Sequence, residues 1–322
     1  MNSPTLGLDL AQATFVAALY LPPKTLQQSF SNSPTGFRKL GQWLHQHFAS
    51  GLRVGLESTS TYGEKLAEWL HAHGHTVCLL NPERVACYAK AIGQRNKTDP
   101  ADAGTIARFV ARHEDLTVWT PPRPEQKSLR SLTRARHQLT ALATAVSNQL
   151  KTAGAEGAQH LGQVLQTIRA QLKALAKDIL AHLRAHPVLQ EQVRRLTTFT
   201  GVGFVTAAVL IAELPPVTPQ TDPRTLCAWA GLTPKRSQSG PREGRSHLSR
   251  KGNAYVRQAL YMPALVAKRF NPLLHAFAQE LASRGKTNRS ILGALSHKML
   301  RILVGMLRTN TDFDAQRPQQ KI

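Results

Sequence analysis

The chain has 322 residues, of which 42% are hydrophobic, and it carries 41 Lys and Arg against 19 Asp and Glu, a formal charge of +22. This length suggests two domains with their own cores, and no apolar run is long enough to predict a membrane span or a secretory leader. We therefore expect a cytoplasmic protein with no membrane partner. Its three cysteines lack metal-site spacing and are interpreted as small buried hydrophobes in a reducing compartment.

The first part of the chain has the pattern of a mixed α/β domain. Strands are expected at 5–10, 14–20, 26–31, 52–57 and 75–80, with helices over 33–48, 83–92 and 100–113 and another helix over Leu66, Trp69 and Leu70. Three strands and a helix followed by alternating strands and helices resemble the ribonuclease H arrangement. In that fold the first and fourth strands lie side by side. We assign residues 1–115 to this domain.

A proline-rich linker at 118–124 separates this domain from a long helical stretch. Leucines recur at helical spacing up to 150, and after a break at 154–157 a heptad seam continues from 161 to 183. Two helices of this kind form either an antiparallel hairpin or a dimerising coiled coil, and the seam is too short to decide between them. We assign residues 116–187 to this segment.

Residues 188–310 are expected to form a mainly α C-terminal domain, followed by a disordered tail at 311–322. A helix, the turn Gly201-Val202-Gly203 and a second helix form a helix-hairpin-helix-like element. Glycines in such a turn let the backbone approach a phosphate closely, with amide groups of the next helix as donors. The alternative is an ordinary packing element without a ligand.

The charge is unevenly distributed between these parts. Residues 1–115 hold 11 Lys and Arg against 9 Asp and Glu, a balance of +2, whereas residues 116–322 hold 30 against 10, a balance of +20. A strongly basic half joined to a nearly neutral one predicts a nucleic-acid-binding part attached to a catalytic part. The alternative is a soluble basic protein with no such partner.

Two carboxylates interrupt strands that otherwise have the composition of buried strands. Asp9 lies in the apolar run 6–10, and Glu57 ends the run 54–57. A buried carboxylate is costly unless it is paired or binds a metal. Taken alone, Glu57 could pair with a lysine, but Asp9 between two leucines has little structural use. In a ribonuclease H arrangement the two would be neighbours at adjacent strand ends.

Asp99 and Asp102 are three residues apart, which places both on one face at the start of a helix. Taken alone, Asp99 could cap that helix, because Pro100 suits its first position. As a set, the four carboxylates favour Mg²⁺, or Mn²⁺ as the alternative ion. Such ions take oxygen ligands and support phosphodiester chemistry.

A basic, serine-containing loop spans 231–253. In one interpretation its cations bind phosphates and its serines add hydrogen bonds. In the other, one serine is a nucleophile that links covalently to DNA, with neighbouring arginines stabilising the developing charge. On the pattern alone the serines are nearly equivalent: Ser237, Ser239, Ser246 and Ser249. The cations expected to bind nucleic acid are Lys235, Arg236, Arg242, Arg245, Arg250, Lys251 and Arg257.

At this point nearly the whole chain resembles the DEDD-type transposases of bacterial insertion sequences, a group that includes the pilin-gene invertases and is described as bridge-RNA-guided recombinases. The N-terminal marks are Gly-Leu-Asp-Leu at 7–10, Leu-Glu-Ser-Thr at 56–59 and Lys-Thr-Asp-Pro-Ala-Asp-Ala at 97–103. The C-terminal marks are Gly-Val-Gly at 201–203, Ala-Gly-Leu-Thr-Pro at 230–234, Gln-Ser-Gly at 238–240 and Lys-Gly-Asn at 251–253 with Arg257.

The resemblance implies a RuvC-like domain whose metal ligands are Asp9, Glu57, Asp99 and Asp102. It also implies a nucleophilic serine that precedes a glycine, and in this loop that serine is Ser239. The family often has a second glycine where this chain has Pro241, so Ser237 remains a reserve candidate.

The hypothesis is therefore a DNA transposase or recombinase in the bacterial cytoplasm, associated with the nucleoid, that uses Mg²⁺ and Ser239 on double-stranded donor and target DNA. The resemblance further implies a structured non-coding guide RNA and a homo-oligomer, dimer or tetramer, whose site combines two domains. Two alternatives stay open. One is a RuvC-like hydrolytic nuclease, and the other is a non-catalytic nucleic-acid-binding protein.

Overall fold

The computed structural model describes residues 3–47, 51–57, 61–94, 98–235, 238–239, 242–243 and 247–315. The chain divides into two compact units, unit 1 at Met1–Pro121 and unit 2 at Pro122–Ile322. The sequence led us to expect three ordered segments. Instead, the long helices predicted from about 125 onward belong to the same unit as the C-terminal helices.

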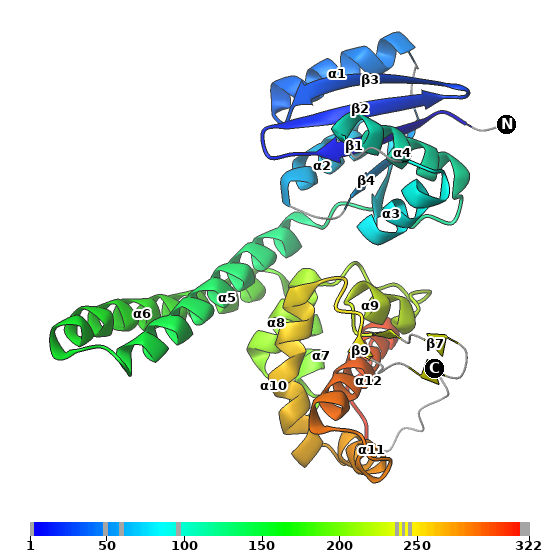
Figure 1. Cartoon of the computed structure of the whole chain (residues 1–322). Helices are drawn as coiled ribbons and strands as arrows, with labels where there is room; N and C mark the ends of the chain where they lie inside the picture. Colours follow the sequence, from blue (N-terminus) through cyan, green and yellow to red (C-terminus); the bar gives the residue numbers. More distant parts are fainter. Residues whose placement is uncertain are drawn as a thin grey trace. The chain divides into compact units, whose positions relative to one another are not determined.

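Unit 1 is a mixed sheet with helices on both faces (Figure 1). The strand order is β3-β2-β1-β4-β5, in which β1 pairs antiparallel with β2 and parallel with β4. Each strand and helix predicted for this part is found close to its expected bounds. The elements are β1 (Thr5–Leu10), β2 (Thr14–Leu21), β3 (Lys24–Ser31), α1 (Pro34–His47), β4 (Arg53–Glu57), η1 (Thr61–Gly63), α2 (Glu64–Ala72), β5 (Thr76–Leu80), α3 (Pro82–Ala91) and α4 (Asp99–Arg112).

Alternation along β1 separates the two faces of this sheet. Leu6 and Leu8 are fully buried in the core that the residues of α1 and α2 complete. Thr5 and Gly7 face the other side, where the Thr5 hydroxyl donates a hydrogen bond to the Ala107 carbonyl of α4 over 2.7 Å. Side chains two apart on a strand share a face. The face of Thr5 and Gly7 is therefore the face that α4 covers.

Unit 2 begins with a helical hairpin, which is one of the two arrangements expected for the heptad seam. α5 (Pro124–Leu150) and α6 (Ala155–Ala185) pack along one another within the chain (Figure 1). The base of α5 is fixed to α8 (Phe204–Glu213) because the Gln126 side-chain amide donates to the Ile211 and Leu214 carbonyls over 2.9 and 2.8 Å. This attachment explains why the hairpin is part of unit 2.

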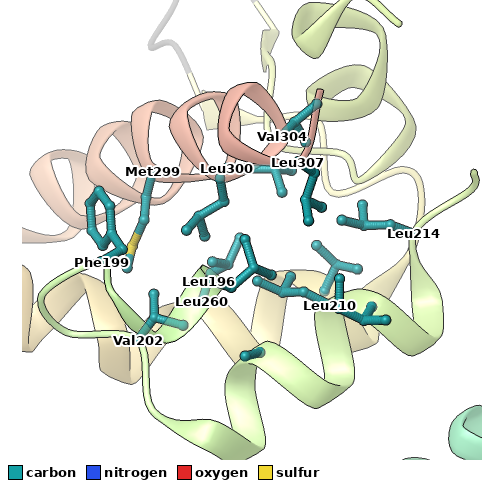
Figure 2. Close-up of a cluster of buried hydrophobic side chains, with 14 of the residues drawn as sticks. Leu196, Phe199, Val202, Leu210, Leu214, Leu260, Met299, Leu300, Val304 and Leu307 are labelled. Atoms are coloured by element: carbon teal, nitrogen blue, oxygen red, sulfur yellow. The ribbon is translucent and has the colours of Figure 1, made fainter. Parts of the chain in front are cut away.

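The remaining helices of unit 2 enclose a second core, shown in Figure 2. They are α7 (Pro187–Thr197), α9 (Pro223–Trp229), α10 (Ala254–Phe270), α11 (Pro272–Ser283) and α12 (Asn288–Thr309). Contrary to the sequence-based expectation, one helix among the described residues, α12, is long and apolar enough to cross a membrane. Half of its apolar window is buried in the protein, and Met299, Leu300, Leu303 and Val304 are buried core residues. α12 is thus the central core helix of unit 2.

The start of the expected disordered tail is anchored to unit 2. The Phe313 amide donates to the Thr198 hydroxyl over 2.9 Å, and the Phe313 ring lies 4.5 Å from that of Phe199. Asp312 pairs with Arg194 over 2.7 Å. An aromatic residue and a charge partner therefore hold 311–315 in place, and the rest of the predicted tail lies outside the described residues.

Candidate active site

Asp9 and Glu57 occupy equivalent positions on adjacent parallel strands. The β1–β4 register pairs Thr5 with Arg53 and continues to the pair Leu8 and Leu56. Asp9 and Glu57 are the next residue of each strand. Both side chains are partly buried, as expected for groups at a strand end. The parallel pairing thus brings together two carboxylates that are far apart in sequence.

Both carboxylates lie on the sheet face that α4 covers. Asp9 alternates with Thr5 and Gly7 on β1, and Glu57 alternates with Gly55 on β4. A Cβ added at Gly7 would collide with the backbone of Ala103 and Ala107 in α4. A Cβ added at Gly55 would meet the side chains of Val110 and Ile106, also in α4. The glycines let α4 lie directly on the two strands.

The direction of α4 brings its N-terminus to the same edge of the sheet. Thr5 contacts Ala107, whereas Gly7, further along β1, also lies against Ala103. Moving along β1 toward Asp9 therefore corresponds to moving along α4 toward its first turn. That turn contains Asp99 and Asp102. All four acids predicted from the sequence thus lie toward one edge of unit 1.

The structure does not give Asp99 the role of an N-cap. Thr98 occupies the N-cap position, and Asp99 is the first residue of α4, with an exposed side chain. An acid in the first turn is favoured by the helix dipole. This position leaves the carboxylate open to solvent.

Asp102 is held by a neighbour that the sequence analysis missed. The Gln94 side-chain amide donates to one Asp102 carboxylate oxygen over 3.0 Å. The Thr105 hydroxyl contacts the side-chain carbonyl oxygen of Gln94, and it also lies 2.8 Å from the backbone carbonyl oxygen of Ala101. The chain Thr105–Gln94–Asp102 therefore fixes the orientation of the carboxylate. No motif signals this glutamine, because it lies outside α4 and outside the acidic motif.

The residue types at this edge fit a divalent ion, because carboxylate oxygens are the ligands that Mg²⁺ and Mn²⁺ take. Within the described ranges, however, no three His, Cys, Asp or Glu side chains gather closely enough to hold a metal. The acids share an edge and a face without forming a closed cluster. Residues 58–60 and 95–97 are outside the described part of the chain.

The serine-containing loop of unit 2 has short strands where the sequence predicted an irregular loop. β6 (Pro234–Lys235) pairs with β9 (His247–Leu248), and β7 (Gln238–Ser239) pairs with β8 (Arg242–Glu243). In this second pair Ser239 lies opposite Arg242. The backbone alone is described for these two residues, so their side chains are not placed. Arg236, Ser237, Arg245 and Ser246 lie outside the described residues.

The base of this loop is closed by backbone contacts between its two sides. The Ser249 amide donates to the Thr233 carbonyl over 2.9 Å, and the Arg250 amide donates to Gly231 over 3.1 Å. Gly231 and Gly252 have φ of +72° and +140°, and a Cβ on Gly252 would collide with the Trp229 carbonyl. Close approach, together with positive φ, requires glycine at both positions.

Arg257, expected to bind nucleic acid, has a structural contact of its own. Its Nη1 donates to the carbonyls of Ala230 and Gly252, both over 2.9 Å. Partial burial, and secondarily the nearby charge of Arg250, lower the pKa of the guanidinium. Arg257 thus ties the two sides of the loop base together. Arg250 and Lys251 are exposed at the same base.

A buried polar network connects the base of this loop to α5 and α8. The Arg134 guanidinium donates to both Glu213 carboxylate oxygens over 2.7 and 2.9 Å, and the Asn253 amide donates to the same carboxylate over 2.8 Å. Asn253 also caps α10 by accepting from the Val256 amide. An Asn just before an apolar helix is an N-cap signal, which identifies Asn253 from sequence. Nothing in the sequence signals its link to Glu213.

Comparison with known proteins shows which family this chain belongs to. Residues 6–153 match a family model described as a transposase, the DEDD-type domain of IS110 elements, and residues 193–279 match the model of the transposase IS116/IS110/IS902 family. The chain is 30% identical over 327 residues to the pilin gene-inverting proteins of Moraxella bovis and Moraxella lacunata, with 98% of each chain covered. It is 26% identical to the transposase of insertion sequence IS1111A from Coxiella burnetii, over 56% of this chain and 57% of that one. The chain therefore belongs to the IS110 family of transposases.

Proposed function

We propose that this transposase cuts and rejoins DNA strands with a metal site on Asp9, Glu57, Asp99 and Asp102 and with Ser239 as the nucleophile. The observation that carries the proposal is the pairing of β1 with β4. It places Asp9 and Glu57 side by side, on the face and at the edge where α4 begins. The strand order and this edge support a ribonuclease H-like, RuvC-like fold for unit 1.

In the proposed reaction the Ser239 Oγ attacks a phosphorus atom of one DNA strand. A bond forms between Oγ and phosphorus, and the bond from phosphorus to a deoxyribose oxygen breaks. The serine proton passes to solvent, and the departing oxygen takes up a proton from solvent. Mg²⁺ at the four carboxylates would supply charge stabilisation for this exchange. The acids and Ser239 belong to different units, so the site is assembled from both units, of one chain or of two chains in a dimer or tetramer.

The phosphoserine linkage conserves a phosphodiester bond, so the strand can be rejoined to a new partner without an external energy source. This distinguishes recombination from hydrolysis, in which water takes the serine's place. The balance of +20 on residues 116–322 supports a polyanionic partner, which we propose to be donor and target DNA together with a structured guide RNA. A cytoplasmic, nucleoid-associated location is part of the same proposal.

The acidic site is tested by measuring strand cutting on DNA that carries the end junctions of the insertion sequence that the transposase would move. Asp9→Asn and Glu57→Gln are expected to abolish Mg²⁺-dependent cutting while DNA binding persists. Asp115→Asn, which removes an exposed acid of unit 1, is the matched control and should retain cutting. If cutting survives both site substitutions, the metal site is elsewhere. Normal binding with no Mg²⁺-dependent cutting in the unsubstituted protein would instead indicate a non-catalytic binder.

A further inference from the structure

A pocket of about 260 Å³ with both polar and apolar lining residues opens in unit 2 where α5, α8 and α10 meet. None of the residues assigned to the acidic site or to the serine loop lines it. Its polar lining residues come from all three helices: Thr133, Arg134, Arg136, His137 and Thr140 from α5, Thr206 and Glu213 from α8, and Tyr255 and Gln258 from α10. The pocket is partly open to solvent, so a ligand can enter it.

The charge balance of the pocket wall is positive. Its acidic residue, Glu213, already accepts two hydrogen bonds from Arg134 and one from Asn253, so its charge is matched. Arg136 adds a second guanidinium, and its Nε is buried with no hydrogen-bond partner among the described residues. A buried donor without a partner is costly. Because Glu213 is already paired with Arg134, the charge of Arg136 is the excess charge on this wall.

The first turn of α8 borders the pocket. Gly203 is its N-cap and offers no side-chain cap, and the Ala207 amide is bonded to the Gly203 carbonyl. The amides of 204–206 precede that bond and have no partner within the helix. Val205 and Thr206 of this turn line the pocket. The positive end of the helix dipole favours an anion at this end of the pocket.

We propose that this pocket binds a phosphodiester group of a nucleic-acid backbone, with Arg136 as its main charged contact. A guanidinium fork matches phosphate oxygens, and the Thr206 hydroxyl supplies a further donor. The Tyr255 ring, which lies 4.7 Å from the Arg134 guanidinium and 5.2 Å from the His137 ring, closes one side. The inference rests on the proposed nucleic-acid-binding function and adds a specific phosphate contact to it.

The test measures how binding depends on salt, for a mixed-sequence DNA duplex and separately for an RNA hairpin. Losing one phosphate contact lowers the slope of log K against log salt concentration by about 0.9 for duplex DNA. We expect Arg136→Gln to produce this change with at least one of the two probes, which also identifies the source of the phosphate. Arg169→Gln removes the same charge from the exposed surface of α6 and should change the slope less.

A second variant separates pocket occupancy from charge and from folding. Ala259 lines the pocket, and Ala259→Phe fills it while every charge is retained. We expect it to weaken binding of the same probe that Arg136→Gln affects. The proposal is overturned if Arg136→Gln and Arg169→Gln change the slope equally, or if Ala259→Phe binds both probes normally. Because no strand cutting is involved, these outcomes are independent of the test of the acidic site.

Discussion

Gln94 and Asp102 are joined by a hydrogen bond of 3.0 Å from the glutamine amide to one carboxylate oxygen. Gln94 in turn accepts a hydrogen bond from the Thr105 hydroxyl, so its side chain is held in place beside Asp102. A proposed metal ligand thereby has a support outside its own helix. Supports of this kind fix ligand orientation in metal sites and are worth about 10- to 100-fold in metal affinity or activity.

The first prediction concerns this support. Gln94→Leu removes the donor and is expected to lower Mg²⁺-dependent strand cutting by about 10- to 100-fold. Raising the Mg²⁺ concentration should recover part of the loss, because orientation affects metal affinity. The measurement is a Mg²⁺ titration of cutting, with Gln28→Leu on the exposed side of β3 as the matched control. Unchanged cutting at every Mg²⁺ concentration would show that Gln94 does not position Asp102.

The second prediction concerns the contact between β1 and α4. Gly7→Ala places a methyl group against the α4 backbone, so the helix must move away from the sheet. Overpacking of this kind costs about 1–3 kcal/mol, and the movement should also displace Asp99 and Asp102. Chemical denaturation and strand cutting measure the two effects. Gly162→Ala, in open space on α6, is the control and should be neutral or stabilising. A fully active Gly7→Ala protein would contradict the α4 placement.

The third prediction concerns the buried pair under the loop base. The Glu213 side chain is 1% exposed and that of Arg134 is 24% exposed. Glu213→Gln leaves the Arg134 charge without its partner and is expected to lower the free energy of unfolding by about 3 kcal/mol, since solvent reaches part of the arginine. Glu280→Gln breaks the exposed pair with Arg284 and should cost less than about 1 kcal/mol. Equal losses in the two variants would mean that the Glu213 pair is not buried.

The fourth prediction concerns thiol reactivity. Burial raises the pKa of Cys227 to about 12 and raises that of Cys78, whereas Cys87 is exposed. Because the thiolate is the reactive form, a raised pKa leaves the two buried thiols protonated and unreactive at neutral pH. A chromogenic thiol reagent at pH 7.5 should therefore label Cys87 rapidly and label the other two only after denaturation. Rapid reaction of all three thiols in the native protein would contradict the burial of Cys78 and Cys227.

The sequence predicted the elements of unit 1 well because each strand has a distinct apolar pattern bounded by polar turns. The neighbouring positions of Asp9 and Glu57 also followed, since strand order determines which strand ends meet. The hairpin itself did not follow, because a heptad seam shows which face of a helix is apolar and does not show whether the helix that covers it belongs to the same chain. The attachment of the hairpin to α8 through Gln126 has no signal in the sequence.

The serine loop was the least predictable part, for two physical reasons. Its strands have two residues each, too few to show a period. The roles of its cations depend on carbonyl partners that the fold brings together, as Arg257 shows by donating to the carbonyls of Ala230 and Gly252. The sequence analysis treated Arg257 as equivalent to its neighbours because charge alone does not show which acceptors a side chain meets.

The measurement that tests the central claim most directly is the isolation of a covalent protein–DNA adduct. The protein is incubated with junction DNA and Mg²⁺, denatured and digested, and the modified peptide is identified by mass spectrometry. The account predicts a phosphodiester link on Ser239 that disappears in Ser239→Ala and in Asp9→Asn and persists in Ser249→Ala. Strand cutting by Ser239→Ala at the normal rate, with no adduct in any sample, would contradict it and show that water is the nucleophile.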